Sequence, residues 1–353
     1  MIDLCLLHFV FCRYVDRERH AVAQAEVDKK GPFMLRVKEL QIDRLRVIFN
    51  KLSVTPESQA AAVSSLLEKI IISNKESSDF LKYTLFKIAT NIASDCQEEF
   101  FNEMDEGHPL KLARVSVGLC ASIKELGDLI KAQFYKQCPL CIPKAAEVGL
   151  SGEDFLRDMG FKAKVCTSNI VPFSLCNCPH NHIIPYFYFY FSYLQNTTSG
   201  EVKWEDKSQW LARMSKMLCT FCVLMIQPEQ YPLGLGDAWA WLAQLVNLST
   251  PRPALTTAAA GGVNALDASG PKPPFFTATA FEVMLRVTAQ HLHRAYGDVF
   301  MALLVVIQDK VLPNLSADMP RREELRKFLT SFVSSMGADF LSLFNKPISA
   351  AAR

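Results

Sequence analysis

The fold class is decided by Ser78-Asp-Phe-Leu-Lys-Tyr-Thr-Leu-Phe-Lys-Ile-Ala-Thr-Asn-Ile92. Apolar residues recur here every three or four positions, the spacing that puts side chains on one face of an α-helix. That face comprises Phe80, Leu81, Leu85, Ile88 and Ile92. Serine and aspartate accept hydrogen bonds from the free N–H groups of a first turn, so we expect Ser78 and Asp79 to cap the helix.

Helical patterns continue on both sides of this stretch. Upstream, Thr55-Pro56-Glu57 puts proline in a first turn, where its missing N–H costs nothing, and predicts a helix through Ile70. The further helices expected downstream run from Leu112 to Leu119, over 124–137 until Cys138-Pro139, from Ser208 through Val223, and over 238–248, 278–296, 298–311 and 321–337. Successive helix pairs predict an all-α, solenoid-like stack, although no repeat of fixed period is visible.

The predicted organisation is one large helical domain behind a shorter segment. Residues 1–55 carry a helical pattern that suits the end of a coiled coil, and residues 56–345 hold the domain. An aromatic stretch without period interrupts it at 166–200, either as an insertion or as translated intron sequence. A stretch rich in Ala, Thr, Gly and Pro at 251–275 is expected to be a flexible loop.

Composition excludes several classes of protein. A net charge of +2 is too small for a chain that binds DNA unaided. The longest apolar run, Ile183–Leu194, is too short to cross a bilayer, and Met1–Phe11 lacks the basic start and cleavage site of a signal peptide. Eleven scattered cysteines, an odd number, indicate free thiols rather than a disulfide framework. We therefore expect a soluble, intracellular protein without a membrane partner.

No catalytic motif is complete in this sequence. Gly234-Leu-Gly236-Asp237 resembles the start of a phosphate loop, but the third glycine and a preceding strand are missing, so helix entry explains it better. The sequence contains no Gly-Lys-Ser/Thr, no His-Glu-x-x-His and no kinase signature. It therefore predicts a protein that is not an enzyme.

Two cysteine motifs have both a chemical and a structural interpretation. Cys176-x-Cys178-x-His180-x-His182 contains ligand types that zinc prefers, but alternate positions could surround one ion only with a strained loop. Cys138-x-x-Cys141 has the spacing of redox enzymes, yet it follows a helix instead of a strand. We interpret the second motif as a structural turn, and Cys219 and Cys222 as core residues.

Five lysines are candidates for binding a multiply charged phosphate ligand. They are Lys131, Lys136, Lys162, Lys164 and Lys203. A lysine ammonium is a mobile point charge that suits phosphate oxygens, so folding could assemble several of them into one clamp. The alternative is that all five are solvated surface residues.

Several motifs, taken in order, resemble the C-terminal domain of the Gle-one family. They are Gly127-Asp-Leu-Ile-Lys-Ala-Gln-Phe-Tyr-Lys-Gln-Cys-Pro139, Met159-Gly-Phe-Lys162, Lys203-Trp-Glu-Asp206 with Arg213-Met-Ser215, Gly234-Leu-Gly-Asp-Ala-Trp-Ala-Trp-Leu-Ala243 and Tyr296-Gly-Asp-Val-Phe300. The similarity covers residues 76–165, 201–250 and 276–345, and it omits the two interruptions described above.

The resemblance implies a fold and a function. The family's domain is a HEAT-like helical-repeat stack similar to the middle domain of translation-initiation scaffolds. Its members act in mRNA export from the nucleus, at the cytoplasmic face of the nuclear pore complex and in the cytoplasm. There they bind a DEAD-box RNA helicase and stimulate its ATPase, and a nucleoporin partner is expected near the carboxyl end. In some members inositol hexakisphosphate lies in a lysine pocket at the helicase interface; by resemblance Lys136, Lys162 and Lys203 would form it here.

Two other functions remain open at this point. The same helical pattern suits a scaffold that binds translation-initiation or termination factors, or RNA, without a preference for the export helicase. The Cys176–His182 segment suits a small metal or redox protein. A pull-down and a metal analysis would separate these from the adaptor.

Overall fold

The structure, a computed structural model, describes residues 32–42, 45–53, 55–97, 107–143, 152–153, 156, 159–164, 203–227, 233–250 and 273–335. The chain divides into two compact units, one of residues 1–148 with 213–353 and one of residues 149–212. The first eleven residues, the Cys176–His182 motif and the stretch 166–200 lie outside the described residues.

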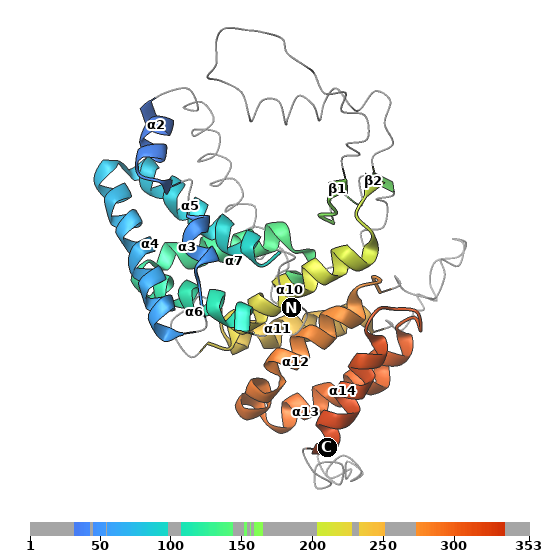
Figure 1. Cartoon of the computed structure of the whole chain (residues 1–353). Helices are drawn as coiled ribbons and strands as arrows, with labels where there is room; N and C mark the ends of the chain where they lie inside the picture. Colours follow the sequence, from blue (N-terminus) through green and yellow to red (C-terminus); the bar gives the residue numbers. More distant parts are fainter. Residues whose placement is uncertain are drawn as a thin grey trace, which may run out of the picture. The chain divides into compact units, whose positions relative to one another are not determined.

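The described elements are helical except for one pair of very short strands (Figure 1). The helices of the first unit are α2 (Pro32–Glu39), α3 (Arg46–Asn50), α4 (Pro56–Glu76), α5 (Ser78–Asp95), α6 (Gly107–Ser122), α7 (Lys124–Gln137), α11 (Leu235–Ser249), α12 (Thr277–Tyr296), α13 (Asp298–Val306) and α14 (Arg322–Ser335), with short turns η2 (Pro139–Cys141), η5 (Ile307–Val311) and η6 (Leu312–Asn314). Helix α10 (Lys207–Met225) begins in the second unit, which also holds β1 (Ala163–Lys164) and β2 (Lys203–Trp204). The predicted all-α, HEAT-like helical stack is confirmed.

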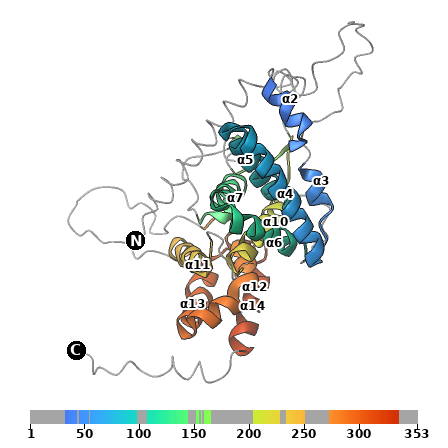
Figure 2. The same ribbon diagram turned by 90° about the vertical axis from the view of Figure 1, so that its left-hand side faces the viewer.

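Helices α4 to α7 pack together as a group of four. Helix α4 contacts α5 and α6, and α7 contacts the same two helices, so each shares its buried face with two neighbours (Figures 1 and 2). The predicted apolar face of α5 is confirmed for Phe80, Leu85, Ile88 and Ile92, which are buried, whereas Leu81 is only half-buried. Between α4 and α5 the hydroxyls of Ser73 and Thr84 lie 2.8 Å apart and share a hydrogen bond, which satisfies both inside the core.

The start of α4 is confirmed, whereas the predicted cap of α5 is wrong by one residue. Pro56 opens α4, and the Ser58 N–H donates to the Thr55 hydroxyl at 3.4 Å. For α5 the cap is Ser77, whose Oγ accepts the Phe80 N–H at 3.1 Å. Ser77 has extended backbone angles, φ −170° and ψ 162°, while Ser78 is already helical. A capping residue must lie outside the helix to turn its side chain back onto the first turn.

The carboxyl-terminal helices pack around α12, which contacts α11, α13 and α14 (Figure 2). The fully buried Glu282 of α12 forms ion pairs with Arg286 on the same helix and with Arg321, whose Nη1 lies 3.1 Å from Oε2. Arg321 has a φ of +59°, in the left-handed region that non-glycine residues seldom adopt. The carboxylate therefore fixes the backbone turn that precedes α14.

Two boundaries differ from the predictions. Helix α11 begins at Leu235, three residues before the predicted Ala238, because the Gly234 N–H donates to Asp237 Oδ2 at 2.8 Å and closes the first turn. The predicted helix over 298–311 is α-helical only as far as Val306 and then widens into a π-helical turn, η5. Pro313 in η6 has no N–H, so the regular helical ladder cannot continue through it. No described helix is long and apolar enough to span a membrane.

The crossing of α4 and α6 depends on Gly118. A Cβ atom built there would lie 3.0 Å from Val63 Cγ2. We expect Gly118→Val to lower the free energy of unfolding by about 1–3 kcal/mol, because the added methyl groups overpack the crossing. Urea denaturation followed by circular dichroism measures this, and Val63→Ala in the same chain should recover part of the loss.

The matched control is Gly236→Val, on the exposed first turn of α11 with no atom within 4 Å of its built Cβ. That change should alter the free energy of unfolding by less than about 0.5 kcal/mol. Equal losses at both glycines would contradict a special role for the α4–α6 crossing.

Candidate functional site

The second unit contains a short antiparallel ribbon that brings three of the candidate lysines together. Strand β1 pairs with β2, with Ala163 opposite Trp204 and Lys164 opposite Lys203. Alternate residues of a strand belong to opposite faces of a sheet. The register therefore places Lys162, Lys164 and Lys203 on one face of the ribbon and Ala163 and Trp204 on the other.

A carboxylate extends the ribbon by one further pair. The Glu205 N–H donates to the Lys162 carbonyl at 2.8 Å, and the Lys162 N–H donates to Glu205 Oε1, also at 2.8 Å. Glu205 is buried, with 9% of its surface exposed, whereas Lys162 is exposed. We call residues 162–164 and 203–205 together the lysine ribbon.

The lysine ribbon is anchored beside the first turn of α10. Trp210 is fully buried, its Nε1 donates to the Met159 carbonyl at 2.7 Å, and its ring stacks on Phe161 at 4.9 Å with an interplanar angle of 6°. Asp206 caps the start of α10, since its Oδ1 accepts the Gln209 N–H at 2.8 Å. Both strands are thus tied to one rigid helix end.

The register brings basic residues of the two strands into opposite positions. Like charges directly opposite each other on an antiparallel pair destabilise it, and Lys164 lies opposite Lys203. Because each ammonium offers three donors, the three lysines on this face suit a ligand with several phosphate groups.

The other two candidates lie on α7, in the first unit. Lys131 Nζ is 3.6 Å from Asp237 Oδ1 and 5.8 Å from the centre of the Tyr135 ring. Its charge is thus already balanced by an acid that also closes the first turn of α11. Lys136 is exposed in the last turn of α7, where the helix dipole favours a cation.

The Cys138-x-x-Cys141 motif is a structural turn, as predicted. It forms η2 directly after α7, both thiols are buried, and the Trp241 Nε1–H donates to the Cys141 carbonyl at 3.1 Å. Burial raises the pKa of the Cys141 and Cys222 thiols well above the ordinary value. Within the described parts of the chain, no group of three or more His, Cys, Asp or Glu side chains is arranged to hold a metal ion.

These buried thiols should react slowly with alkylating reagents. Burial raises the pKa of Cys120 to about 12, so at pH 9 only about one thiol in a thousand is ionised. Modification of Cys120 by iodoacetamide should be at least about 100-fold slower in the native chain than in urea at pH 9. Above pH 9 the rate of Cys120 modification in the native chain should rise about tenfold per pH unit. Peptide mass spectrometry measures both rates, and ordinary reactivity of native Cys120 at pH 8 would contradict its burial.

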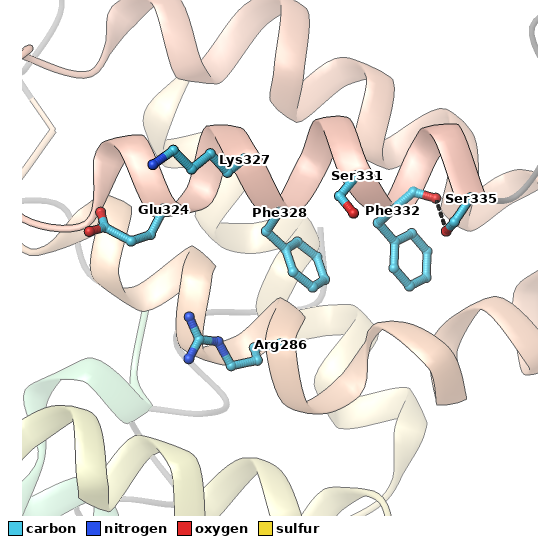
Figure 3. A pocket seen from close by; sticks show the side chains of 7 residues that line it. All are labelled: Arg286, Glu324, Lys327, Phe328, Ser331, Phe332 and Ser335. Carbon is cyan, nitrogen blue, oxygen red and sulfur yellow. Dashed lines mark hydrogen bonds between the residues drawn. The ribbon is translucent and has the colours of Figure 1, made fainter. Parts of the chain in front are cut away.

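A second concave feature lies between α12 and α14. It has a volume of about 430 Å³, and its lining consists of Arg286, Glu324, Lys327, Phe328, Ser331, Phe332 and Ser335. Figure 3 shows the rings of Phe328 and Phe332 projecting from the same side of α14, with Arg286 opposite them on α12. Phe332 also packs edge-on against Phe300, with ring centroids 6.3 Å apart, so this wall is continuous with the core. Its lining thus combines two aromatic rings with three charged side chains.

Comparison with known proteins identifies the family. A family model described as "GLE1-like protein" matches residues 37–170 and 190–308, most of the chain. The chain belongs to the GLE1-like family. The resemblance inferred from the ordered motifs is thereby confirmed.

Two curated relatives agree with this assignment. The "mRNA export factor GLE1" of Rattus norvegicus is 21% identical over 311 residues, which cover 79% of this chain and 36% of the relative. The protein of the same description from Mus musculus is 24% identical over 288 residues, covering 78% of this chain and 31% of the relative. The chain therefore spans about a third of the length of the curated relatives it matches.

Two solved structures share the fold. Both are structures of the C-terminal domain of a Dbp5 variant from S. cerevisiae bound to Gle1 and IP6, in one case with a Gle1 variant. In each case the matched chain is 18% identical, with a TM-score of 0.64 and coverage of 92% of this chain and 94% of that chain. The agreement over nearly the whole length shows that the GLE1-like helical stack is the fold of this chain.

Proposed function

We propose that this chain is the helicase-activating part of an mRNA export factor and is not itself an enzyme. It would act at the cytoplasmic face of the nuclear pore complex and in the cytoplasm, binding a DEAD-box RNA helicase and stimulating its ATPase. The observation that carries this proposal is the family match across most of the chain, together with relatives described as mRNA export factors. The two similar structures, in which Gle1 is bound to Dbp5, support the choice of partner.

A helical adaptor can stimulate a helicase without doing chemistry. The helicase alternates between closed and open arrangements of its two lobes, and an adaptor that binds the open form more tightly shifts the equilibrium towards it. The shift is limited by the difference between the two affinities, so a rigid surface is an advantage. The crossed packing of α4 to α7 supplies such rigidity.

Inositol hexakisphosphate is the ligand that we assign to the lysine ribbon. Lys162, Lys164 and Lys203 share one face of the ribbon, and a ligand with six phosphates can contact all three at once. Lys136 and Lys131 of α7 are retained as further candidates, and Lys131 also pairs with Asp237. The IP6 named with the similar yeast complexes supports this choice of ligand.

We further assign the groove between α12 and α14 to a nucleoporin segment. It lies in the carboxyl-terminal region where the family resemblance places this partner, and it offers two phenylalanine rings beside Arg286 and Lys327. We also propose the domain organisation expected from the sequence, which is a segment over residues 1–55 followed by a domain over residues 56–345. Binding of a pore-derived peptide in a fluorescence anisotropy titration tests the groove, and Lys327→Glu should weaken that binding.

The decisive experiment measures helicase turnover. The purified chain is added to the export helicase from the same organism, with RNA and ATP, with and without inositol hexakisphosphate. ATP hydrolysis should rise several-fold with the chain and further with the ligand. A chain that neither binds the helicase nor changes its turnover would overturn the proposal.

The alternative is a scaffold for translation factors. It shares the HEAT-like fold but would bind translation-initiation or termination factors, or RNA, with no preference for the export helicase. Competition distinguishes the two: an excess of initiation factor should leave binding to the export helicase unchanged if the adaptor function is correct.

A further inference from the structure

The geometry points to Glu205 as a positioning residue for the lysine ribbon, acting as a hydrogen-bond acceptor and not through its charge. This inference rests on the proposed binding of inositol hexakisphosphate. In a regular antiparallel ladder, a hydrogen-bonded pair of residues exchanges two backbone bonds. Here the Glu205 N–H makes one of them to Lys162, while the Lys162 N–H donates to the Glu205 carboxylate at 2.8 Å.

The position of Glu205 suits this role better than a role in ligand binding. A carboxylate beside three lysines opposes the binding of phosphate, so a surface selected only for affinity would not contain it. The residue is buried and directed backwards onto the ribbon, whereas the neighbouring Asp206 is directed forwards onto the Gln209 N–H of α10. The two acids therefore join the ribbon to the helix that carries Trp210.

Two substitutions distinguish a role of Glu205 as a hydrogen-bond acceptor from a role of its charge. Glutamine keeps a carbonyl oxygen that can accept the Lys162 N–H but carries no charge, whereas alanine removes both. If Glu205 acts as an acceptor, Glu205→Gln preserves the register that sets Lys164 opposite Lys203 and also removes the charge that opposes phosphate. Glu205→Ala leaves the Lys162 N–H without this acceptor and loosens the pairing at this end of the ribbon, while the backbone bond from the residue 205 N–H remains.

The test measures binding of inositol hexakisphosphate to the full chain by isothermal titration calorimetry. Glu205→Ala should weaken binding about tenfold, the effect of losing one hydrogen bond to a charged group. Glu205→Gln should bind at least as tightly as the unchanged chain. Lys164→Ala should cost several times less affinity in the Glu205→Ala chain than alone, because its position opposite Lys203 is then held less firmly. Glu153→Ala, which removes an exposed acid of the same unit, is the matched control for net charge and should leave binding unweakened.

Hydrogen exchange supplies a readout that does not depend on the ligand. Exchange of the Lys162 amide should accelerate in Glu205→Ala and stay slow in Glu205→Gln. The inference is overturned if Glu205→Ala binds like the unchanged chain, or if Glu205→Gln is as weak as Glu205→Ala. If the unchanged chain does not bind the ligand, the proposed ligand is overturned instead, and the exchange rates alone decide whether Glu205 holds the ribbon.

Discussion

Replacing Lys164 and Lys203 together by glutamate is expected to lower the affinity for inositol hexakisphosphate by about 100-fold or more. Each charge-assisted hydrogen bond contributes roughly 1.5–3 kcal/mol, and two such bonds would be lost from directly opposed positions of the ribbon. The stimulation of the helicase ATPase that the chain gives without ligand should change little. The extra stimulation that inositol hexakisphosphate adds should be largely lost. Calorimetry and ATPase assays on the same preparations measure both effects.

Salt and a second lysine provide the controls for this prediction. Ligand binding by the unchanged chain should weaken as salt is raised, because screening acts on all contacts between lysine and phosphate. Lys310→Glu, at an exposed position of η5, makes the same change of charge outside the ribbon and should leave affinity within about twofold. Full affinity in the Lys164→Glu, Lys203→Glu chain would show that the ligand binds elsewhere.

Trp210→Ala is expected to be the most destabilising single change in the second unit. The side chain is fully buried, stacks on Phe161 and donates to the Met159 carbonyl, so its removal leaves a cavity and an unsatisfied acceptor. A loss of about 3–5 kcal/mol is typical for deleting a buried tryptophan. Because Trp210 anchors the lysine ribbon, ligand affinity should fall as well. Urea denaturation and calorimetry measure the two losses.

Two further variants separate packing from anchoring. Trp210→Phe keeps an aromatic ring against Phe161 but loses the bond to Met159, so it should cost roughly 1 kcal/mol. Trp239→Ala removes a half-buried tryptophan of α11 that packs on Tyr296, and it should reduce stability without changing ligand affinity. A Trp210→Ala chain with unchanged stability and affinity would contradict the anchoring role.

The sequence predicted the long helices well because their pattern is local. Spacings of three and four within α5 identify its buried face, and Pro56 identifies the start of α4. The cap of α5 was misplaced because two serines stand side by side, and only the backbone angles show that Ser77 lies outside the helix. A choice between neighbouring residues of one type depends on tertiary structure.

The candidate site was less accessible to sequence reasoning. Strands β1 and β2 contain two residues each, too few to show an alternating pattern, and their partners are far apart in the chain. The family resemblance selected Lys162 and Lys203, but the register that opposes Lys164 to Lys203 came from the structure. The acceptor role of Glu205 carried no local signal. The groove could have been suspected from Phe328 and Phe332, which are four positions apart on one helix.

The shared carboxylate of Glu282 links two properties of the α12–α14 region. Arg286 pairs with this buried acid and also lines the groove, while Arg321, whose backbone is left-handed, pairs with the same acid. A carboxylate brought into the groove would compete with Glu282 for the Arg286 guanidinium. By thermodynamic reciprocity, if a ligand in the groove changes the equilibrium constant for forming the turn before α14, formation of that turn changes the affinity for the ligand by the same factor.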